Sequence, residues 1–449
     1  MRNILFITIL CLAMASLVSS LYPVLEVQAE LSVLTFFVCL ISASYSSPTQ
    51  INPVSLMCIT TGIFLYGRFL VSYIFGHNDY MTADWFIYGP IESNILSSSL
   101  SAVSLFLCGI TLGAGKIGSI QISHDLILGK FALFSAAIFM PFTIYRIYTN
   151  LEFFSTGDYL NLYLNGGPGD LPYTLGGWII VSLTAFISSK PNIKYSIVAF
   201  ILGILFCLSE TLKGARGIAL AQIVVLSWLF MVSQNLRLSG LKMLVFGFIL
   251  IFFSEYIGRL RIGNSTEEMA ISGITNGFLD FFYSQGTSLL FVVATNQNLS
   301  KFSILDGFQS TFALFFDGLA KLLNLLPDGQ NADFAAATSS LSHRIAYMVN
   351  SDMYLSGMGM GGSAVAESML YFSTFGPLIA GLFTGIFINF LCRYASGSAK
   401  RLFILAATLP FILLIPRETQ LYFLIPFLKA IFFLVIMKFL VKQYNGQQS

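Results

Sequence analysis

Basic residues at the ends of long apolar segments are the first candidates for chemistry in this sequence. An arginine side chain can bind phosphate or carboxylate through two parallel N–H groups, whereas lysine acts as a point charge. The candidate anion ligands are Lys213, Arg216, Arg259, Arg261, Arg344 and Arg417. They predict an anionic ligand, and the alternative for each of them is a structural ion pair with a nearby acidic residue.

A glycine-rich stretch between Gly357 and Glu367 adds a second kind of anion ligand. Gly361, Gly362 and Ser363 precede a segment with helical spacing, and backbone N–H groups at the start of a helix favour a bound anion. The stretch contains the pattern GxGxxG, but no strand precedes it, so we exclude a dinucleotide site. The alternative is a loop-to-helix joint without a ligand.

Two residues of the same region could accept a proton in a catalytic step. Glu367 lies four residues after Ser363, on the same face of the predicted helix, and this spacing is one residue too long for a capping box. His343 could assist a hydroxyl nucleophile or a phosphate leaving group near neutral pH. An ion-paired Glu367 and a structural His343 are the alternatives.

Other catalytic classes lack their sequence motifs. The chain has no Asp-x-Asp, HExxH or GxSxG, and the segment from Gly109 to Lys116 has the wrong glycine spacing for a P-loop. The six cysteines lie in or at the end of apolar runs without metal-ligand spacing, so we predict no metal site and no cofactor. A net charge of +2 gives no reason to expect nucleic acid.

The composition predicts the elements that must position these residues. Of the 449 residues, 56% are apolar and 10% are charged, against roughly 25% charged in soluble domains. About twelve membrane-spanning helices of roughly 20 residues each account for this apolar content. We therefore predict an all-α polytopic membrane protein. Any reaction in it must use a donor that is already activated and that reaches the site through the membrane.

Apolar runs separated by polar clusters predict where these helices lie. The predicted spans are 4–21, 31–45, 54–75, 97–112, 126–147, 173–187, 195–212, 218–233, 241–257, 375–391, 402–415 and 421–441. The second span is short enough to be tilted or re-entrant. Residues 1–257 thus hold nine helices and a short outer loop at 150–172, residues 258–374 form one large outer connection, and residues 375–449 hold three more helices.

The large outer connection is expected to be ordered. Apolar spacing compatible with helices occurs at 287–294, 311–326 and 363–372. Ordered structure of this length outside a membrane is usually functional.

The distribution of charge predicts the orientation of the chain in the membrane. With the amino terminus inside, the inner connections hold eight lysines and four arginines, and of the 21 acidic residues only Asp125 lies inside. Short loops rich in lysine and arginine are typical of the cytoplasmic side. The outer side carries seven arginines and three lysines, so we expect the anionic ligand at the outer face.

Lys429 lies within the final predicted span. Charged residues inside a membrane are functional candidates by default. The nearby Pro426 supports an alternative, a kinked helix whose lysine reaches toward the membrane surface.

Three short motifs accompany this architecture. They are Lys213-Gly214-Ala215-Arg216-Gly217 at the start of a span, Gly359-x-Gly361-Gly362-Ser363-x-x-x-Glu367, and Phe372-x-x-Phe375-Gly376 before the next span. Together with the many spans and the large outer connection, they resemble the O-antigen polymerases of the Wzy family. The likeness covers most of the chain in architecture.

This resemblance implies an inverting glycosyltransferase of GT-C-like architecture in the bacterial inner membrane, with its active site facing the periplasm. It implies that oligosaccharide repeat units linked to undecaprenyl pyrophosphate are joined without added metal or nucleotide. A Wzz-type chain-length regulator and a Wzx-type flippase are the partners that it implies. By family analogy, Arg216 and either Arg344 or Arg259 are the expected essential arginines, and Glu367 ranks above His343 as the base because it lies in the matching motif.

Two other functions fit part of the same pattern. The related O-antigen ligase would transfer the glycan to lipid A-core and is expected to depend on a histidine of the large loop. A lipid-linked oligosaccharide flippase is expected to have paired internal repeats and short loops. The long outer connection and the lack of an evident repeat disfavour the flippase.

Overall fold

The computed structural model describes residues 2–46, 51–76, 82–83, 89–156, 164, 170–214, 216–236, 247, 249, 252, 256 and 273–446. Regular structure in these residues is helical, apart from one antiparallel pair of two-residue strands, β1 (Thr82–Ala83) and β2 (Gly89–Pro90). The predicted all-α class is therefore confirmed for the part of the chain that the structure describes.

Ten helices or continuous helix runs among the described residues are long and apolar enough to cross a membrane. They are α1 (Arg2–Leu21), α2 (Leu25–Tyr45), α3 (Pro53–Thr61) with η1 (Gly62–Tyr66) and α4 (Gly67–Phe75), α5 (Ser93–Ala114), α6 (Leu126–Thr156), α8 (Leu171–Gly176) with α9 (Trp178–Ser188), α10 (Ile193–Leu212), α11 (Arg216–Ser233), α22 (Phe375–Ala395) and α24 (Leu424–Gly446). The chain is thus a multi-pass membrane protein.

Two of the twelve predicted spans are not among these ten. The span predicted at 402–415 corresponds to α23 (Ala399–Ile412), which has 14 residues. At 1.5 Å per residue, a helix of this length is shorter than the roughly 30 Å hydrocarbon core of a bilayer. The span predicted at 241–257 lies largely outside the described residues.

Two helices are longer than predicted because polar residues extend them: α2 begins earlier and α6 ends later. Helix α2 includes Glu26 in its first turn, where an acidic side chain interacts favourably with the helix dipole, and its 21 residues correct the expectation of a short span. Helix α6 has 31 residues and carries Arg146 and Asn150 beyond or near the apolar part. These two side chains lie four residues apart on one face, and both contact Glu210 of α10.

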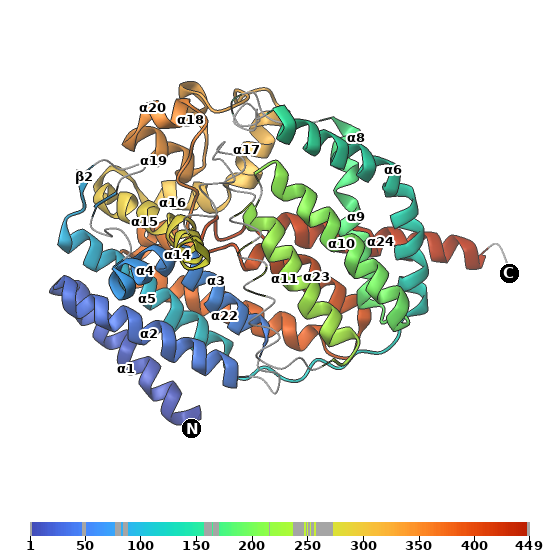
Figure 1. Cartoon of the computed structure of the whole chain (residues 1–449), viewed down its shortest axis with the longest axis horizontal. Coiled ribbons are helices and arrows are strands. Elements are labelled where there is room, and N and C mark those ends of the chain that lie inside the picture. Colours follow the sequence, from blue (N-terminus) through green and yellow to red (C-terminus); the bar gives the residue numbers. More distant parts are fainter. Residues whose placement is uncertain are drawn as a thin grey trace.

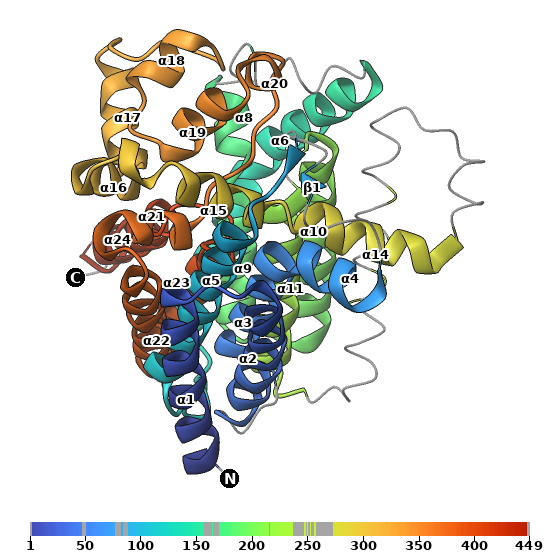
Figure 2. The same ribbon diagram turned by 90° about the vertical axis from the view of Figure 1, so that its left-hand side faces the viewer.

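The segment 273–374 folds into short helices at one end of the spans. They are α14 (Gly273–Gln285), α15 (Ser288–Gln297), η2 (Leu299–Lys301), α16 (Ile304–Thr311), α17 (Ala313–Leu322), α18 (Ala332–Ala337), α19 (Leu341–Val349), α20 (Ser351–Leu355) and α21 (Ala364–Phe372). Figure 2 shows α16 to α20 at the end of the molecule opposite the amino terminus. The three helices predicted in this segment are present.

This segment packs directly onto the spans. The side chain of Asn296 in α15 donates to the hydroxyl oxygens of Ser98 and Ser99 in α5, at 2.6 and 3.1 Å. At Gly286, an added Cβ would lie 2.1 Å from the backbone nitrogen of Arg68, so α14 and α4 meet at van der Waals distance. The described part of the large connection is therefore continuous with the membrane-spanning body.

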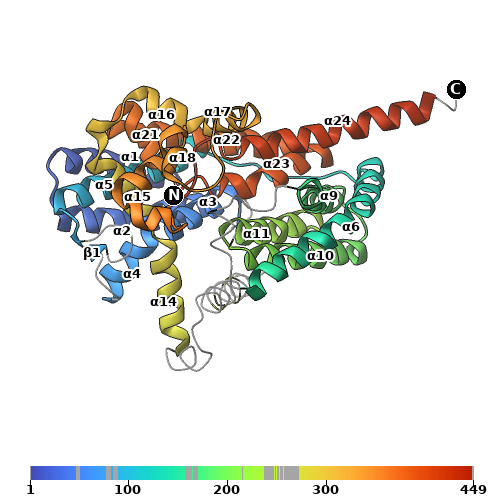
Figure 3. The ribbon, with the colours of Figure 1, turned by 90° about the horizontal axis from the view of Figure 1, so that it is seen from above.

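The spans form two groups that α22, α23 and α24 connect. Seen from above, α1 to α5 lie on one side and α6 to α11 on the other (Figures 1 and 3). Helix α22 packs along α5, while α23 packs against α9 and α11. The turn between α23 and α24 thus lies where the two groups and the segment 273–374 come together.

Candidate functional site

The glycine-rich motif packs against the turn between α23 and α24. The Gly362 N–H donates to the Arg417 carbonyl oxygen at 2.9 Å, and the Ala364 N–H donates to the Ile415 carbonyl oxygen at 3.1 Å. Gly361 has a φ of +74°, a conformation that favours glycine. The Gly362 N–H therefore has a partner in the chain, and the predicted anion-binding role of Gly361, Gly362 and Ser363 stays a prediction.

Glu367 lies beneath this motif and is 2% exposed. The hydroxyl of Ser310 donates to its Oε1 at 2.6 Å, and the backbone N–H of Gln420 donates to its Oε2 at 3.0 Å. Burial raises the pKa of the Glu367 carboxyl to about 7, although both hydrogen bonds lower it. Ser363 caps α21 through its hydroxyl, which accepts from the Val365 N–H at 3.2 Å.

Two arginines are held by the last turn of α14. The Nη1 of Arg417 donates to Oε1 of Gln285 at 2.8 Å, and its guanidinium lies 5.5 Å from the ring centre of Phe64. The guanidinium of Arg68 lies 4.0 Å from the ring centre of Tyr283. Arg68 is 2% exposed, although it belongs to a membrane-spanning run. One short helix therefore brings both cations to the same place.

Arg216 begins α11 on the opposite side of the same region. Ile218 and Ala221 of α11 pack with Phe64 and Leu414 in a small apolar cluster. Leu414 precedes Arg417 by three residues in the chain. The structure thus brings the start of α11, which carries Arg216, to the turn that carries Arg417. The predicted ligands Arg259 and Arg261 lie outside the described residues.

His343 and Arg344 have other surroundings. The His343 ring packs against Phe334 and Tyr354, with Nδ1 at 3.1 Å from the Tyr354 hydroxyl. Burial lowers the pKa of His343 to about 4, so its imidazole is neutral at neutral pH. Arg344 forms an ion pair with Asp306 at 2.6 Å, and this side-chain pairing is the structural alternative raised for it. Neither residue forms a hydrogen bond or ion pair with Glu367.

Lys213 belongs to a network of buried charges at the C-terminal end of α10. Glu210 accepts from Nε and Nη2 of Arg146, both at 2.7 Å, and its Oε2 lies 2.6 Å from the ammonium of Lys213. Lys213 also donates to the Tyr173 hydroxyl at 3.0 Å, and Arg146 donates to the Tyr173 carbonyl. A two-pronged arginine–carboxylate pair of this kind fixes geometry as well as charge.

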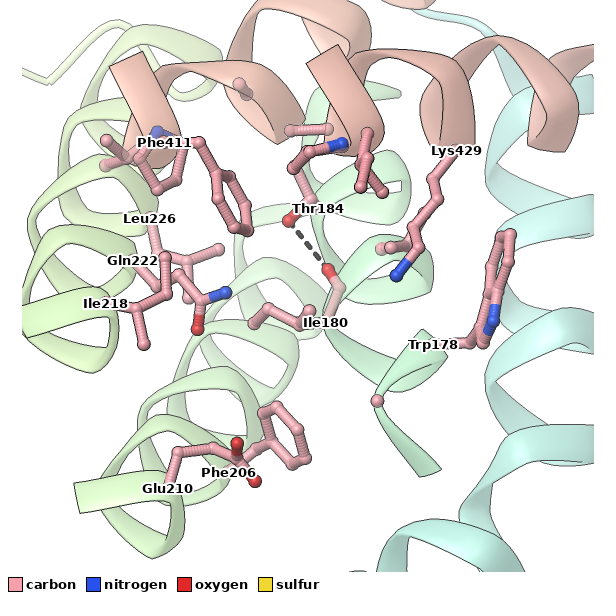
Figure 4. Close-up of a pocket in the computed structure, with 18 of the residues that line it drawn as sticks. Trp178, Ile180, Thr184, Phe206, Glu210, Ile218, Gln222, Leu226, Phe411 and Lys429 are labelled. Carbon is pink, nitrogen blue, oxygen red and sulfur yellow. Dashed lines mark hydrogen bonds between the residues drawn. The ribbon is translucent and has the colours of Figure 1, made fainter. Parts of the chain in front are cut away.

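This network forms one wall of a cavity of about 480 Å³ among the spans. The lining includes apolar residues of α9, α11 and α23, such as Ile180, Leu226 and Phe411, together with Leu314 of α17 and Tyr422 (Figure 4). Lys429 of α24 points into the cavity near Trp178, with its ammonium 6.0 Å from the ring centre. The cavity therefore combines apolar walls with charged side chains.

The family comparison decides the identity of this architecture. The model of the O-antigen polysaccharide polymerase Wzy family matches residues 2–448. The chain belongs to this Wzy family. No curated protein and no solved structure matches the chain.

For this Wzy chain, sequence patterns missed several residues of the region. Arg68 and Arg146 were visible as charges within or beside apolar segments, which is the signal that had already selected Lys429 and that could have ranked them higher. Gln285 and Ser310 had no such signal, because each is a common polar residue in an ordinary helical segment. Their contacts with Arg417 and Glu367 follow only from the tertiary packing.

Proposed function

We propose that this chain joins oligosaccharide repeat units linked to undecaprenyl pyrophosphate at the periplasmic face of the inner membrane. In the proposed reaction, a hydroxyl of the incoming repeat unit attacks the anomeric carbon of the growing glycan. The bond from that carbon to the phosphate oxygen breaks, undecaprenyl pyrophosphate leaves, and a base takes the hydroxyl proton. Attack opposite the leaving group inverts the anomeric carbon.

One observation carries this proposal beyond the family match. The motif from Gly359 to Glu367 packs on the turn that bears Arg417, and α14 and α11 bring Arg68 and Arg216 toward the same turn. Guanidinium groups aimed at a leaving diphosphate stabilise the charge that develops on it. Arg417 and Arg216 are the proposed ligands of the leaving group.

Glu367 is the proposed base. A carboxyl whose pKa is raised to about 7 can accept a proton effectively near neutral pH. A His343 imidazole with its pKa lowered to about 4 is a much weaker base, and no structural feature of His343 favours the ligase alternative. Because Ser310 covers the buried Glu367, we propose that α16 moves aside when the acceptor binds.

Surface glycans separated by gel test the proposal in cells. A strain without this gene should carry single repeat units on its lipopolysaccharide, and the intact gene should restore the long-chain ladder. Arg216→Ala and Arg417→Ala should each abolish the ladder while the protein still inserts in the membrane. Unaltered ladders in the deletion strain would defeat the polymerase proposal.

Glu367→Gln separates catalysis from packing in the same assay. The amide can still accept from the Gln420 N–H and donate to Ser310, so it preserves the contacts of the carboxyl but removes the base. We expect no polymer from this variant at a normal protein level. A long-chain ladder would instead make Glu367 a residue that holds the turn in place.

Two protein partners belong to the same proposal. A Wzx-type flippase would supply the lipid-linked repeat unit on the outer side, and a Wzz-type regulator would set the length of the product. Both are proposed from family membership alone.

A further inference from the structure

The cavity described above carries more positive than negative charge. Its charged lining residues are Arg146, Lys213, Lys429 and Glu210, which sum to a net charge of +2. Glu210 is already shared between Arg146 and Lys213. Lys429 has no hydrogen-bond or ion-pair partner among the residues that the structure describes, so no carboxylate of these residues balances its charge in the cavity.

An uncompensated ammonium in a membrane-spanning helix is costly. Charged residues within membrane-spanning helices are rare, and they usually face a bundle interior or a polar cavity. Lys429 is the sixth residue of α24, and Figure 4 shows its side chain directed into the cavity, with Trp178 to one side of it. A bound anion would offset this cost.

The apolar walls restrict the class of that anion. Ile180, Val225 and Ala406 come from three different helices and line the same space as Lys429. A free inorganic anion would gain nothing from these side chains, whereas a lipid would bury its chain against them. The volume of about 480 Å³ holds a headgroup and the first part of a chain, and the rest must pass between the helices into the bilayer.

We propose that this cavity binds the diphosphate headgroup of a polyprenyl lipid, with Lys429 as a direct ligand of the anion. The site is separate from the arginines near Glu367, because Arg417, Arg216 and Arg68 do not line the cavity. The polymerase reaction proposed above uses two lipid-linked substrates, and this inference rests on that proposal when it assigns one of them here. Tyr422 lines the cavity and also packs beside Phe64 and Leu414, so it lies between the two sites.

Direct binding to the purified full-length protein tests this site. We expect Lys429→Gln to weaken the binding of undecaprenyl diphosphate about 10-fold or more, since a hydrogen bond to a charged group contributes about 1.5–3 kcal/mol. Lys429→Arg should retain most of the affinity. Lys438→Gln, which changes an exposed lysine of the same helix, should leave the affinity unchanged.

Two further probes identify the source of the anion. Undecaprenol, which has the chain without charge, should bind weakly and equally to the intact protein and to Lys429→Gln. Inorganic pyrophosphate at millimolar concentration should not displace the lipid. Equal lipid affinity in Lys429→Gln, or displacement by inorganic pyrophosphate, would overturn the proposal. Because these are binding measurements, they remain decisive even if the protein does not polymerise glycans.

A second, independent feature is an apolar surface on α16 and α17. Exposed apolar residues follow helical spacing along α17 and its C-cap: Phe315, Phe316, Leu319, Leu322 and Leu323, with Leu322 at 78%. The rings of Phe308, Phe312 and Phe316 join this stripe to the exposed apolar residues of α16. We call the exposed residues of these two helices the α16–α17 face.

The polar residues of α17 point the other way. Asp317 accepts from the Thr338 hydroxyl at 2.6 Å and from the Ser339 N–H at 2.8 Å, and Lys321 lies over the Phe334 ring. The α16–α17 face therefore turns away from the rest of the segment 273–374. An apolar surface of this extent marks an interaction site in a folded protein.

We propose that the outer leaflet of the bilayer covers the α16–α17 face. The face adjoins the spans, because Leu314 of α17 lines the cavity together with Ile425 of α24, and α24 exposes Leu428 and Phe432 beside it. A helix with one apolar and one polar face lies in the membrane interface with its apolar side in the acyl region. The bilayer would then support α16, whose Ser310 contacts Glu367.

Spin labels on the full-length protein in liposomes test this placement. With the native cysteines replaced, labels at Leu319 and Leu322 should be more accessible to oxygen than to a water-soluble nickel complex. A label at Asp352, an exposed polar position on α20, should show the reverse. Equal nickel accessibility at Leu322 and Asp352 would place the face in water. Low accessibility of these labels to both oxygen and the nickel complex would mean that protein covers the α16–α17 face. Either result would overturn the proposal.

Discussion

Glu367 connects parts of the chain that are distant in sequence. Its carboxyl accepts from Ser310 of α16 and from the backbone of Gln420 before α24. The same Ser310 hydroxyl oxygen accepts from the Leu341 N–H of α19 at 3.2 Å. One buried side chain therefore holds α16, α19 and the arginine-bearing turn against α21.

The raised pKa of Glu367 predicts a pH dependence of stability. The carboxyl has an ordinary pKa of 4.5 and a folded pKa of about 7, so the folded chain binds the proton more tightly. Its contribution is fully present below pH 4.5 and is lost as the pH rises through 7, a change of about 3 kcal/mol. Thermal unfolding in detergent should show this loss for the intact protein, whereas Glu367→Gln should show a flatter profile. Parallel profiles would contradict the assignment.

Sequence patterns identified part of this arrangement at the residue scale. Arg216, Arg417 and Glu367 were predicted as functional candidates from residue type and motif, and the structure brings their segments together. The contacts themselves were not predictable. Gln285 is 132 residues from Arg417 in the chain, and one sequence contains no signal for such a pairing.

At the scale of elements, the packing of α5 against α22 depends on glycine. An added Cβ at Gly381 would lie 2.1 Å from the Phe106 carbonyl oxygen, and one at Gly385 would lie 2.2 Å from the Ile110 carbonyl oxygen. Small residues four apart allow helix backbones to approach closely inside membranes. These glycines thus fix α22 beside α5.

Gly385→Ala should therefore destabilise the protein by about 1–3 kcal/mol, because the helices must separate to admit the methyl group. The midpoint of thermal unfolding in detergent measures this effect. Gly318→Ala in α17 is the matched control, since nothing lies within 4 Å of its added Cβ, and it should be neutral or slightly stabilising. Equal midpoints for the two variants would contradict the close packing of α5 and α22.

The charge network between α6 and α10 holds these two helices together, as the glycines hold α22 beside α5. Arg146→Gln should destabilise the folded protein by about 3 kcal/mol, because it removes the two-pronged partner of the buried Glu210. Lys194→Gln, at the exposed start of α10, should change stability by less than about 0.5 kcal/mol. A shift for Arg146→Gln as small as that of Lys194→Gln would mean that the pair adds little to stability.

Hydropathy predicted the elements better than their ends. Apolar runs located the ten helix runs that can cross a membrane, because the bilayer imposes both length and composition. The predicted end of α6, at residue 147, was too early. Arg146 and Asn150 bind Glu210 of α10, and these contacts allow the polar sequence after the apolar run to stay helical. The π-helical turn η1 was also not predicted. Gly62 begins this turn and Gly67 follows it, and an added Cβ would clash with the Phe36 ring at Gly62 and with the Phe282 carbonyl oxygen at Gly67, so close tertiary packing surrounds the turn.

For the whole molecule, the arrangement of helices produces two cationic regions on either side of Tyr422. The arginines near Glu367 lie where α4, α11, α14 and the turn before α24 meet, and the cavity with Lys429 lies among α9, α10, α11, α23 and α24. A polymerase that joins two lipid-linked chains needs two such regions within reach of one another. This arrangement is the basis of the proposed reaction.

Reconstitution of the purified full-length protein in liposomes tests the central claim most directly. The only glycan supplied is the lipid-linked repeat unit, and the products are separated by length. The account predicts lipid-linked glycans of two or more units together with released undecaprenyl pyrophosphate, and it predicts neither product from Arg417→Ala. Failure of the intact protein to lengthen the glycan, or transfer only when lipid A-core is added, would contradict it.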